Sequence, residues 1–305
     1  MMLTPVLVLQ MILVVAGLSF IAIFSRAVYR QHKANTLDLR QSWKAAIVGL
    51  VANFVDTLGV SSFAVMTACF KNFKMMEDSK IPGTLNVAAT MATYTQAFLF
   101  LGAVEVEPIT LISMILSSVI GALVGAKVVS GLNVQKVRIG MGTALLVMAV
   151  LIIAGQLKLF PAGGEAMGLE GNKLLIGVIG NFLIGMLLPI GIGNFAPCMT
   201  LVYMLGMHPL AAFPIMMGAA ALMMAFSSYK FVKSGAYAID AALMVNIFGV
   251  VGVLLAVGLV KSLNVSWINW LLIAVVVYTA ISMFSSYYKA LKQVQTNESS
   301  LKQAA

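Results

Sequence analysis

The chain has 305 residues, of which 61% are hydrophobic and only 10% charged, with a mean hydropathy of +1.01 and a formal net charge of +9. Soluble domains carry about 25% charged residues, so the composition excludes a water-soluble globular protein. The apolar runs are mostly of about 18 residues or more, long enough to cross a hydrocarbon core as helices, whereas a membrane β-barrel would show short alternating segments. The predicted fold class is therefore an all-α polytopic membrane protein.

Nine apolar segments follow one another along the chain. They cover residues 3–25, 45–70, 84–104, 108–126, 137–157, 174–205, 210–229, 236–260 and 266–288. The first is too long for the apolar part of a signal peptide and lacks a basic start and a convincing cleavage site, so we expect it to be a retained span.

The basic residues decide how these segments cross the membrane. Nine crossings would place the basic cluster 127–138 outside and the acidic pair at 105 and 107 inside, against the positive-inside rule. If 45–70 and 174–205 instead enter the membrane and return, sixteen of the nineteen Lys and Arg residues become cytoplasmic. We therefore predict seven transmembrane helices plus two re-entrant broken helices, an outside N-terminus and a cytoplasmic C-terminus, in a bacterial inner membrane.

Three pairs of short matches indicate an internal duplication. They join residues 49–54 (GLVANF) with 177–182 (GVIGNF), 59–64 (GVSSFA) with 191–196 (GIGNFA), and 128–134 (VVSGLNV) with 259–265 (LVKSLNV). The order of the matches is kept, and each half then contains one hairpin and three spans, so the second repeat is inverted relative to the first. The predicted divisions are a first helix and basic linker (1–40), repeat 1 (41–160), repeat 2 (161–290) and a polar cytoplasmic tail (291–305).

Inverted repeats with matching Gly/Pro-interrupted segments are typical of secondary transporters, whose substrate lies between the halves near the midplane. An inverted-repeat channel is the alternative from the same pattern. A membrane enzyme is the alternative of another class, but the chain has no HExxH, GxSxG or Walker A motif. The basic clusters are explained by membrane insertion, so we expect the lipid bilayer and a small ligand as partners, and no nucleic acid.

The glycine-rich motifs at 56–64 (DTLGVSSFA) and 189–197 (PIGIGNFAP), with 81–84 (IPGT) and 121–125 (GALVG), resemble those of the TauE/SafE sulfite exporter family. The resemblance covers residues 40 to 290. It implies a two-part helical fold, compatible with a homodimer, that transports small sulfur-containing anions such as sulfite, sulfoacetate or thiosulfate, or other organic anions. The first motif departs from the family pattern, because it has Val60-Ser61-Ser62 where many members have three glycines.

The breaks in the two hairpins predict an anion site. The second half of a broken helix starts with unpaired N–H groups and the positive end of the helix dipole, which attract anions. Candidate binding residues are Gly59, Ser61 and Ser62 in the first hairpin, and Gly191, Gly193 and Asn194 in the second. Close packing of helices through small residues is the alternative reading.

Asp56, next to Thr57, is the acidic residue predicted to lie in the membrane interior. A buried ionisable group there is costly enough to indicate function, so Asp56 is a candidate for carrying H⁺ or holding Na⁺. Its alternative role is to cap a half-helix beginning near Leu58.

The remaining candidate residues are polar or small side chains near the two hairpins. Asn53 and Asn181 occupy equivalent repeat positions and could bridge the hairpin arms or contact the ligand. Asn86 and Thr90 share one helix face, where they could line the cavity or form interhelical hydrogen bonds. Cys198 could touch a sulfur ligand, although a buried apolar role fits it as well. The two cysteines give no disulfide or metal spacing, and we expect no metal and no cofactor.

Overall fold

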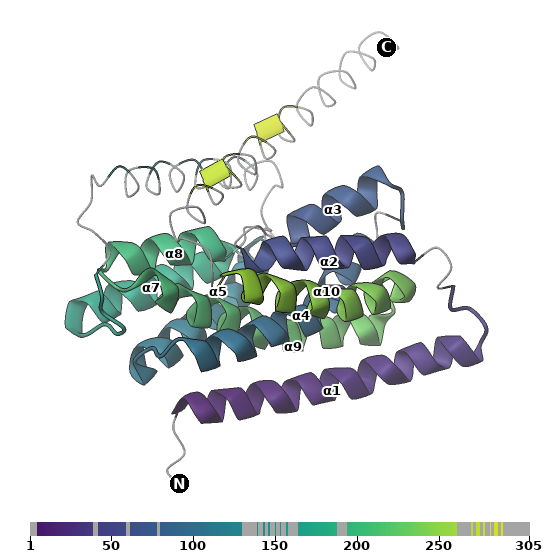
Figure 1. The fold of residues 1–305 in the computed structure, drawn as a ribbon, viewed down its shortest axis with the longest axis horizontal. Coiled ribbons are helices and arrows are strands. Elements are labelled where there is room, and N and C mark those ends of the chain that lie inside the picture. Colours follow the sequence, from purple (N-terminus) through teal and green to yellow (C-terminus); the bar gives the residue numbers. More distant parts are fainter. Residues whose placement is uncertain are drawn as a thin grey trace.

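The computed structural model describes residues 5–38, 42–58, 62–77, 80–129, 164–187 and 194–260, with isolated positions between 139 and 157 and between 270 and 288. The described part is nearly all helical (Figure 1). Its helices are α1 (Pro5–Lys33), α2 (Trp43–Thr57), α3 (Ser62–Asn72), α4 (Ile81–Ala103), α5 (Pro108–Val129), α7 (Gly171–Leu187), α8 (Phe195–Met204), α9 (Ala212–Ser234) and α10 (Ile239–Val260), with a 3-10 turn at Pro209–Ala211. The predicted all-helical fold class is confirmed.

The described helices run between two ends of different charge. At one end, which we call the basic end, α1 and α9 finish and α4 and α10 begin; it carries Arg30, Lys33, Lys44, Lys80, Lys230 and Lys233. Contacts join its loops, because Thr84 Oγ1 accepts from the Ala238 N–H at 2.9 Å and Asp240 Oδ1 accepts from the Asp38 N–H at 3.1 Å. The opposite end, which we call the acidic end, carries Glu105, Glu107, Glu165 and Glu170, together with Lys173.

Each of the two broken segments finishes at the end of the bundle where it started. The segment of α2 and α3 starts at the basic end and returns there to enter α4 (Figure 1). The segment of α7 and α8 starts at the acidic end, where Ala166 pairs with Met207 in an isolated bridge and the His208 N–H donates to Ala166 O at 2.9 Å. Each segment is therefore a pair of short helices, which we call a hairpin, and the two hairpins start at opposite ends of the bundle.

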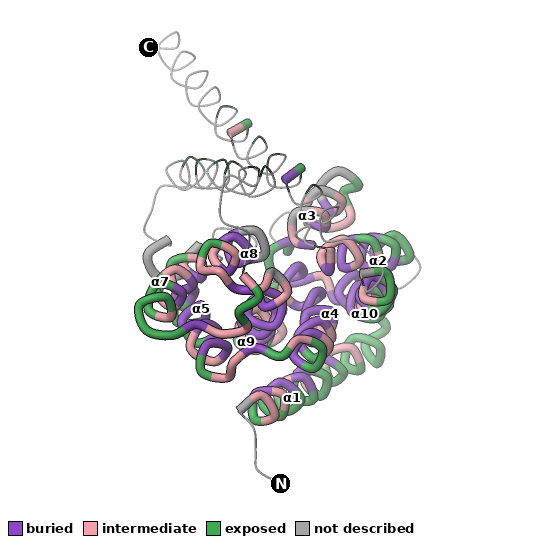
Figure 2. The backbone as a smooth tube through the Cα atoms, turned by 60° about the vertical axis from the view of Figure 1, so that its left-hand side comes forward, coloured by how far each residue is buried: buried purple, intermediate pink, exposed green. Residues whose placement is uncertain are grey.

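Helix α4 lies at the centre of the bundle, and Figure 2 shows its surface largely buried while the outer faces of α1 and α7 are exposed. Its buried side chains include Thr84, Thr90, Thr93 and Gln96, which face other helices. A helix surrounded by protein can carry such polar groups, whereas a lipid-facing helix cannot. The polar content of α4 is therefore a consequence of its central position.

Four of the described helices are long and apolar enough to cross a membrane: Val6–Lys33, Pro108–Gly125, Ala212–Ser234 and Ile239–Leu259. The chain is thus an integral multi-pass membrane protein. Helix α4, predicted as a span over 84–104, is not among the four, because its buried polar residues lower its hydropathy. The predicted spans at 137–157 and 266–288 lie almost entirely outside the described residues.

Glycines bring two pairs of helices into backbone contact. A Cβ atom at Gly252 of α10 would overlap Leu50 O of α2, and one at Gly121 of α5 would overlap Phe182 O of α7. Gly49 would likewise meet Val245 Cα at 2.7 Å. Such close approach is how small residues hold membrane helices together, so α2 is fixed along α10 and α7 along α5.

Candidate functional site

The first hairpin is closed by a carboxylate that lies inside it. Asp56 is in the last turn of α2, and its Oδ1 accepts the N–H of Ser62, the first residue of α3, at 2.7 Å. An anionic side chain at a helix N-terminus is favourable because it pairs with the free N–H groups and the positive end of the dipole. Asp56 therefore caps the second half-helix, which is the alternative to ion coupling given above. That helix begins at Ser62, so the expected start near Leu58 is wrong.

Gln96 of α4 completes this polar centre. Its Nε2 donates to Asp56 Oδ2 at 3.1 Å and to Thr57 Oγ1 at 2.8 Å, while the Thr57 hydroxyl donates to Asn53 O at 2.8 Å. Gln96 and Thr57 have no exposed surface, whereas Asp56 is partly exposed. We call Asp56, Thr57, Ser62 and Gln96 the Asp56 cluster.

The second hairpin has no comparable carboxylate in the part of it that the structure describes. Asn194 is the N-cap residue of α8, makes no capping bond with its side chain, and is 8% exposed. Its Nδ2 donates weakly to Met216 O of α9 at 3.4 Å, and its Oδ1 has no partner among the described residues. The residue at the Asp56 position of the repeat, 128 residues on, is Ile184, so the start of α8 is left without an internal anion.

The two equivalent asparagines do different things. Asn53 Nδ2 donates to Gly49 O within its own helix at 2.8 Å, and Asn181 Nδ2 donates to Met114 O of α5 at 2.7 Å. Both residues are buried, and the Asn181 Oδ1 has no partner among the described residues. Among the described residues, neither amide nitrogen bonds to the other arm of its hairpin, and the bridging role stays a prediction.

Asn86 and Thr90 lie nearer the basic end of α4 than the Asp56 cluster does. Thr90 is buried, and its Oγ1 lies 2.6 Å from Ser228 Oγ of α9, which also donates to Asn86 O at 3.1 Å. Asn86 Nδ2 donates to Pro82 O at 2.9 Å. The Thr90 hydroxyl therefore joins α4 to α9, whereas the Asn86 side-chain amide bonds within α4.

Of the other candidates, Cys198 is completely buried in α8, one helical turn after Asn194. Gly59, Ser61, Gly191 and Gly193 lie outside the described residues. No group of three or more His, Cys, Asp or Glu side chains that could hold a metal ion occurs in the part of the chain that the structure describes.

Sequence reasoning gave Gln96 and Asn246 no place among the candidate site residues. Asn246 of α10 donates from Nδ2 to Val87 O at 2.9 Å and accepts the Met91 N–H on Oδ1 at 3.0 Å, so it is inserted beside one turn of α4. The available signal was a lone amide within an apolar helix, which in membranes finds a partner on another helix. The partner itself could not be read from the sequence.

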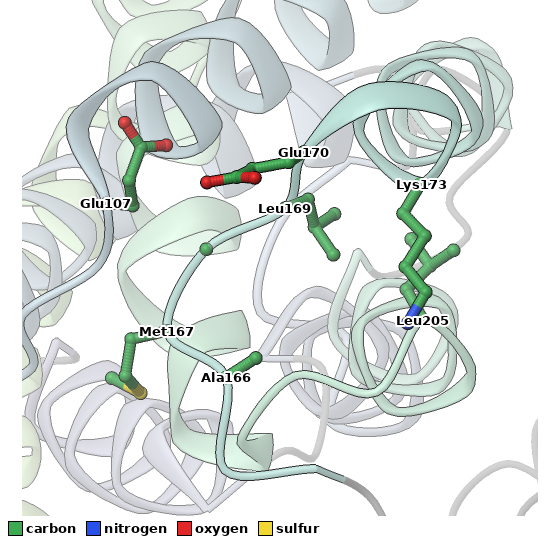
Figure 3. Close-up of a pocket in the computed structure, with 8 residues that line it drawn as sticks. Glu107, Ala166, Met167, Leu169, Glu170, Lys173 and Leu205 are labelled. Carbon is green, nitrogen blue, oxygen red and sulfur yellow. The ribbon is translucent and has the colours of Figure 1, made fainter.

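A pocket of about 480 Å³ opens at the acidic end, away from the Asp56 cluster (Figure 3). It is lined by Glu107, Glu170, Lys173 and Leu205 with residues 166–169, and the Glu170 side chain extends toward Glu107. Glu107 caps α5, because its two carboxylate oxygens accept the N–H groups of Ile109 at 3.0 Å and Thr110 at 2.7 Å. The Glu107 carboxylate is thus already engaged by the backbone of α5, and the pocket lies at the acidic end rather than beside the Asp56 cluster.

A nearly all-helical bundle with four helices of membrane-spanning length and a buried polar cluster between its helices is consistent with a membrane transporter. The model of the sulfite exporter TauE/SafE family matches residues 1–152, the first half of the chain, and the chain belongs to this family. The resemblance of the motifs at 56–64, 81–84 and 121–125 is confirmed, and the family is one of transporters rather than enzymes. No curated protein matches the chain significantly.

Proposed function

We propose that the protein is a secondary transporter that moves a small sulfur-containing anion by alternating access between two inverted repeats. The proposed topology has seven spans and two re-entrant hairpins, with the basic end in the cytoplasm, in agreement with the positive-inside rule. The N-terminus is then outside and the C-terminus inside. The two hairpins would place the substrate between the repeats.

The helix contacts support the inverted repeats. The order hairpin, helix, helix occurs twice, as α2/α3, α4, α5 and as α7/α8, α9, α10. A Cβ atom at Gly49 would lie 2.7 Å from Val245 Cα, and one at Gly177, 128 residues further on, would lie 3.6 Å from Sδ of Met114, which stands 131 residues before Val245. Such exchanged contacts are expected of two repeats related by a two-fold axis.

The anion site is inferred from the difference between the N-termini of α3 and α8, the second helices of the two hairpins. At the start of α3 the anion position is filled by Asp56, whereas at the start of α8 Asn194 leaves it without a side-chain cap. The described surroundings there, Asn194 and Cys198, are neutral. We therefore place the substrate anion at the N-terminus of α8, where backbone N–H groups and the dipole would bind it.

The sulfur-containing substrate class is taken from the family, which is described as sulfite exporters. An anion channel and a transporter of a non-sulfur carboxylate remain the alternatives from the same site chemistry. Both would use the same neutral donors.

The test is flux of ³⁵S-labelled sulfite into proteoliposomes, measured with sulfite inside and outside to detect counterflow. Accelerated exchange with internal sulfite is expected of a transporter and would exclude a channel. Asn194→Asp places a negative charge at the proposed site and should abolish flux, whereas Asn172→Asp, on the exposed first turn of α7, should leave it unchanged. Normal flux in a folded Asn194→Asp protein would remove the site assignment.

A further inference from the structure

We infer that the Asp56 cluster is a binding site for a monovalent cation of the size of Na⁺, formed by oxygen atoms of Asp56, Thr57 and Gln96. The inference deepens the proposed function, because it assigns the coupling ion to the first hairpin while the anion occupies the second. It rests on three features of the cluster: the convergence of acceptors, a spare buried oxygen and an uncompensated carboxylate.

The acceptors converge on one point. Asp56 Oδ2 and Thr57 Oγ1 lie 3.1 and 2.8 Å from a single atom, Gln96 Nε2. The hydroxyl proton of Thr57 is used on Asn53 O, so the lone pairs of Thr57 Oγ1 are turned toward Gln96. The Gln96 amide group therefore occupies the position in which a cation would find two oxygens.

The spare oxygen belongs to Gln96 itself. Its Oε1 is buried without a hydrogen-bond partner among the described residues, and the residue has no exposed surface. Leaving a buried acceptor unpaired is costly, so each such group calls for an explanation. A half-turn of the amide about its last torsion would exchange Nε2 with Oε1 and add a third oxygen to the other two.

The carboxylate has no opposite charge beside it in the described part of the chain. Its interactions are the hydrogen bonds from Ser62 and Gln96. Asp56 lies thirteen residues beyond Trp43 in α2, or about 20 Å along the helix axis at 1.5 Å per residue, which is deep in a hydrocarbon core of about 30 Å. It also lies in the last turn of α2, where the negative end of the helix dipole favours a cation.

A cation satisfies this arrangement better than a proton does. With the amide turned, a proton on Asp56 would bridge one pair of oxygens, Asp56 Oδ2 and Gln96 Oε1. Thr57 Oγ1 and Gln96 Oε1 would still face each other as two acceptors, because the Thr57 proton is already donated to Asn53 O. A Na⁺ ion would bind all three oxygens at once.

The experiment is a thermal-unfolding titration of the purified full-length protein in nanodiscs without any sulfite or other substrate. NaCl is compared with KCl and choline chloride at constant total chloride. A ligand that binds the folded state stabilises it, so Na⁺ at ten times its dissociation constant should raise Tm by about 3 °C or more. An equal response to K⁺ and choline, or a Tm that follows pH but not Na⁺, would overturn the inference.

Variants separate an oxygen ligand from a structural amide. Gln96→Leu removes the oxygen and should abolish the Na⁺ response, whereas Gln96→Glu removes the NH₂ donor, keeps the oxygens and should retain or strengthen it. If the Gln96 amide only donates hydrogen bonds, Gln96→Glu should instead lose stability and show no response. Thr57→Val should weaken the response if Gln96→Leu does not fold, and Asp240→Asn, a carboxyl change at the basic end, should leave it intact.

The outcome is independent of the anion site. A Na⁺ response in a protein that shows no sulfite flux would keep the cation site and remove the proposed substrate. Flux of sulfite without any Na⁺ response would keep the proposed substrate and remove the cation site.

Discussion

Replacement of Asn246 by leucine should destabilise the bundle, because this one amide ties α10 to the central helix α4. Its two bonds to α4 go to Val87 O and to the N–H of Met91, which are the partners of one i→i−4 pair of that helix, while a third bond goes to Ala242 O within α10. Leucine has a similar size but can make neither bond to α4. Because only 4% of Asn246 is exposed, water cannot take over the bonds.

The magnitude follows from the two lost bonds. Interhelical hydrogen bonds in membrane proteins contribute about 0.6 kcal/mol each on average and about 1.7 at most, so the free energy of unfolding should fall by about 1–3 kcal/mol. Complete loss of partners would cost more, but Val87 and Met91 can bond to each other once the amide is gone. At about 2–4 °C per kcal/mol, Tm should fall by about 2–12 °C.

The assay is thermal unfolding in nanodiscs at neutral pH. Asn172→Leu makes the same chemical change at an exposed position of α7 and should leave Tm unchanged. If Asn246→Leu melted within about 1 °C of the native protein, the two bonds would contribute nothing measurable and the reasoning would be refuted.

Three further outcomes are expected. Gly121→Leu should prevent folding, because the leucine side chain would overlap Phe182 O. Gly258→Leu should be tolerated, because nothing lies within 4 Å of its Cβ position. Size-exclusion profiles after detergent extraction distinguish the two variants, and equal profiles would contradict the contact between α5 and α7. Partial burial opposes ionisation of Glu107, but hydrogen bonds from Thr110 and Ile109 outweigh it and lower its pKa. The Glu107 cap should therefore stabilise the protein fully above about pH 4.5, and its contribution should be lost as pH falls through the lowered pKa. Glu107→Gln should reduce Tm at pH 7, and the difference from the native protein should shrink as pH falls below about 4.5, as measured by thermal unfolding across pH. A pH-independent difference would contradict this. Ser228→Ala should lower Tm by about 1–4 °C through the lost contacts with Thr90 and Asn86, and an unchanged Tm would mean that α9 does not depend on them.

The helices themselves could be predicted from the sequence, because runs of apolar residues fix length and membrane location. The predicted segment 108–126 became α5, 236–260 became α10, and the motifs at 56–59 and 189–194 correctly marked the ends of α2 and α7. The same hydropathy misled at the ends: the first helix continues to Lys33 rather than residue 25, since polar residues outside the hydrocarbon can extend a helix.

The tertiary structure alone decided what the polar residues do. Asp56 was visible as an isolated acid in the membrane, but its two partners, Ser62 and Gln96, are brought to it by the turn of the hairpin and by the packing of α4. A hydropathy pattern records which side chains avoid lipid, one residue at a time. Which buried polar groups meet depends on how the helices are rotated and packed. In this chain the glycine contacts fix α2 along α10, and the bonds of Asn246 join α10 to α4, the helix that carries Gln96.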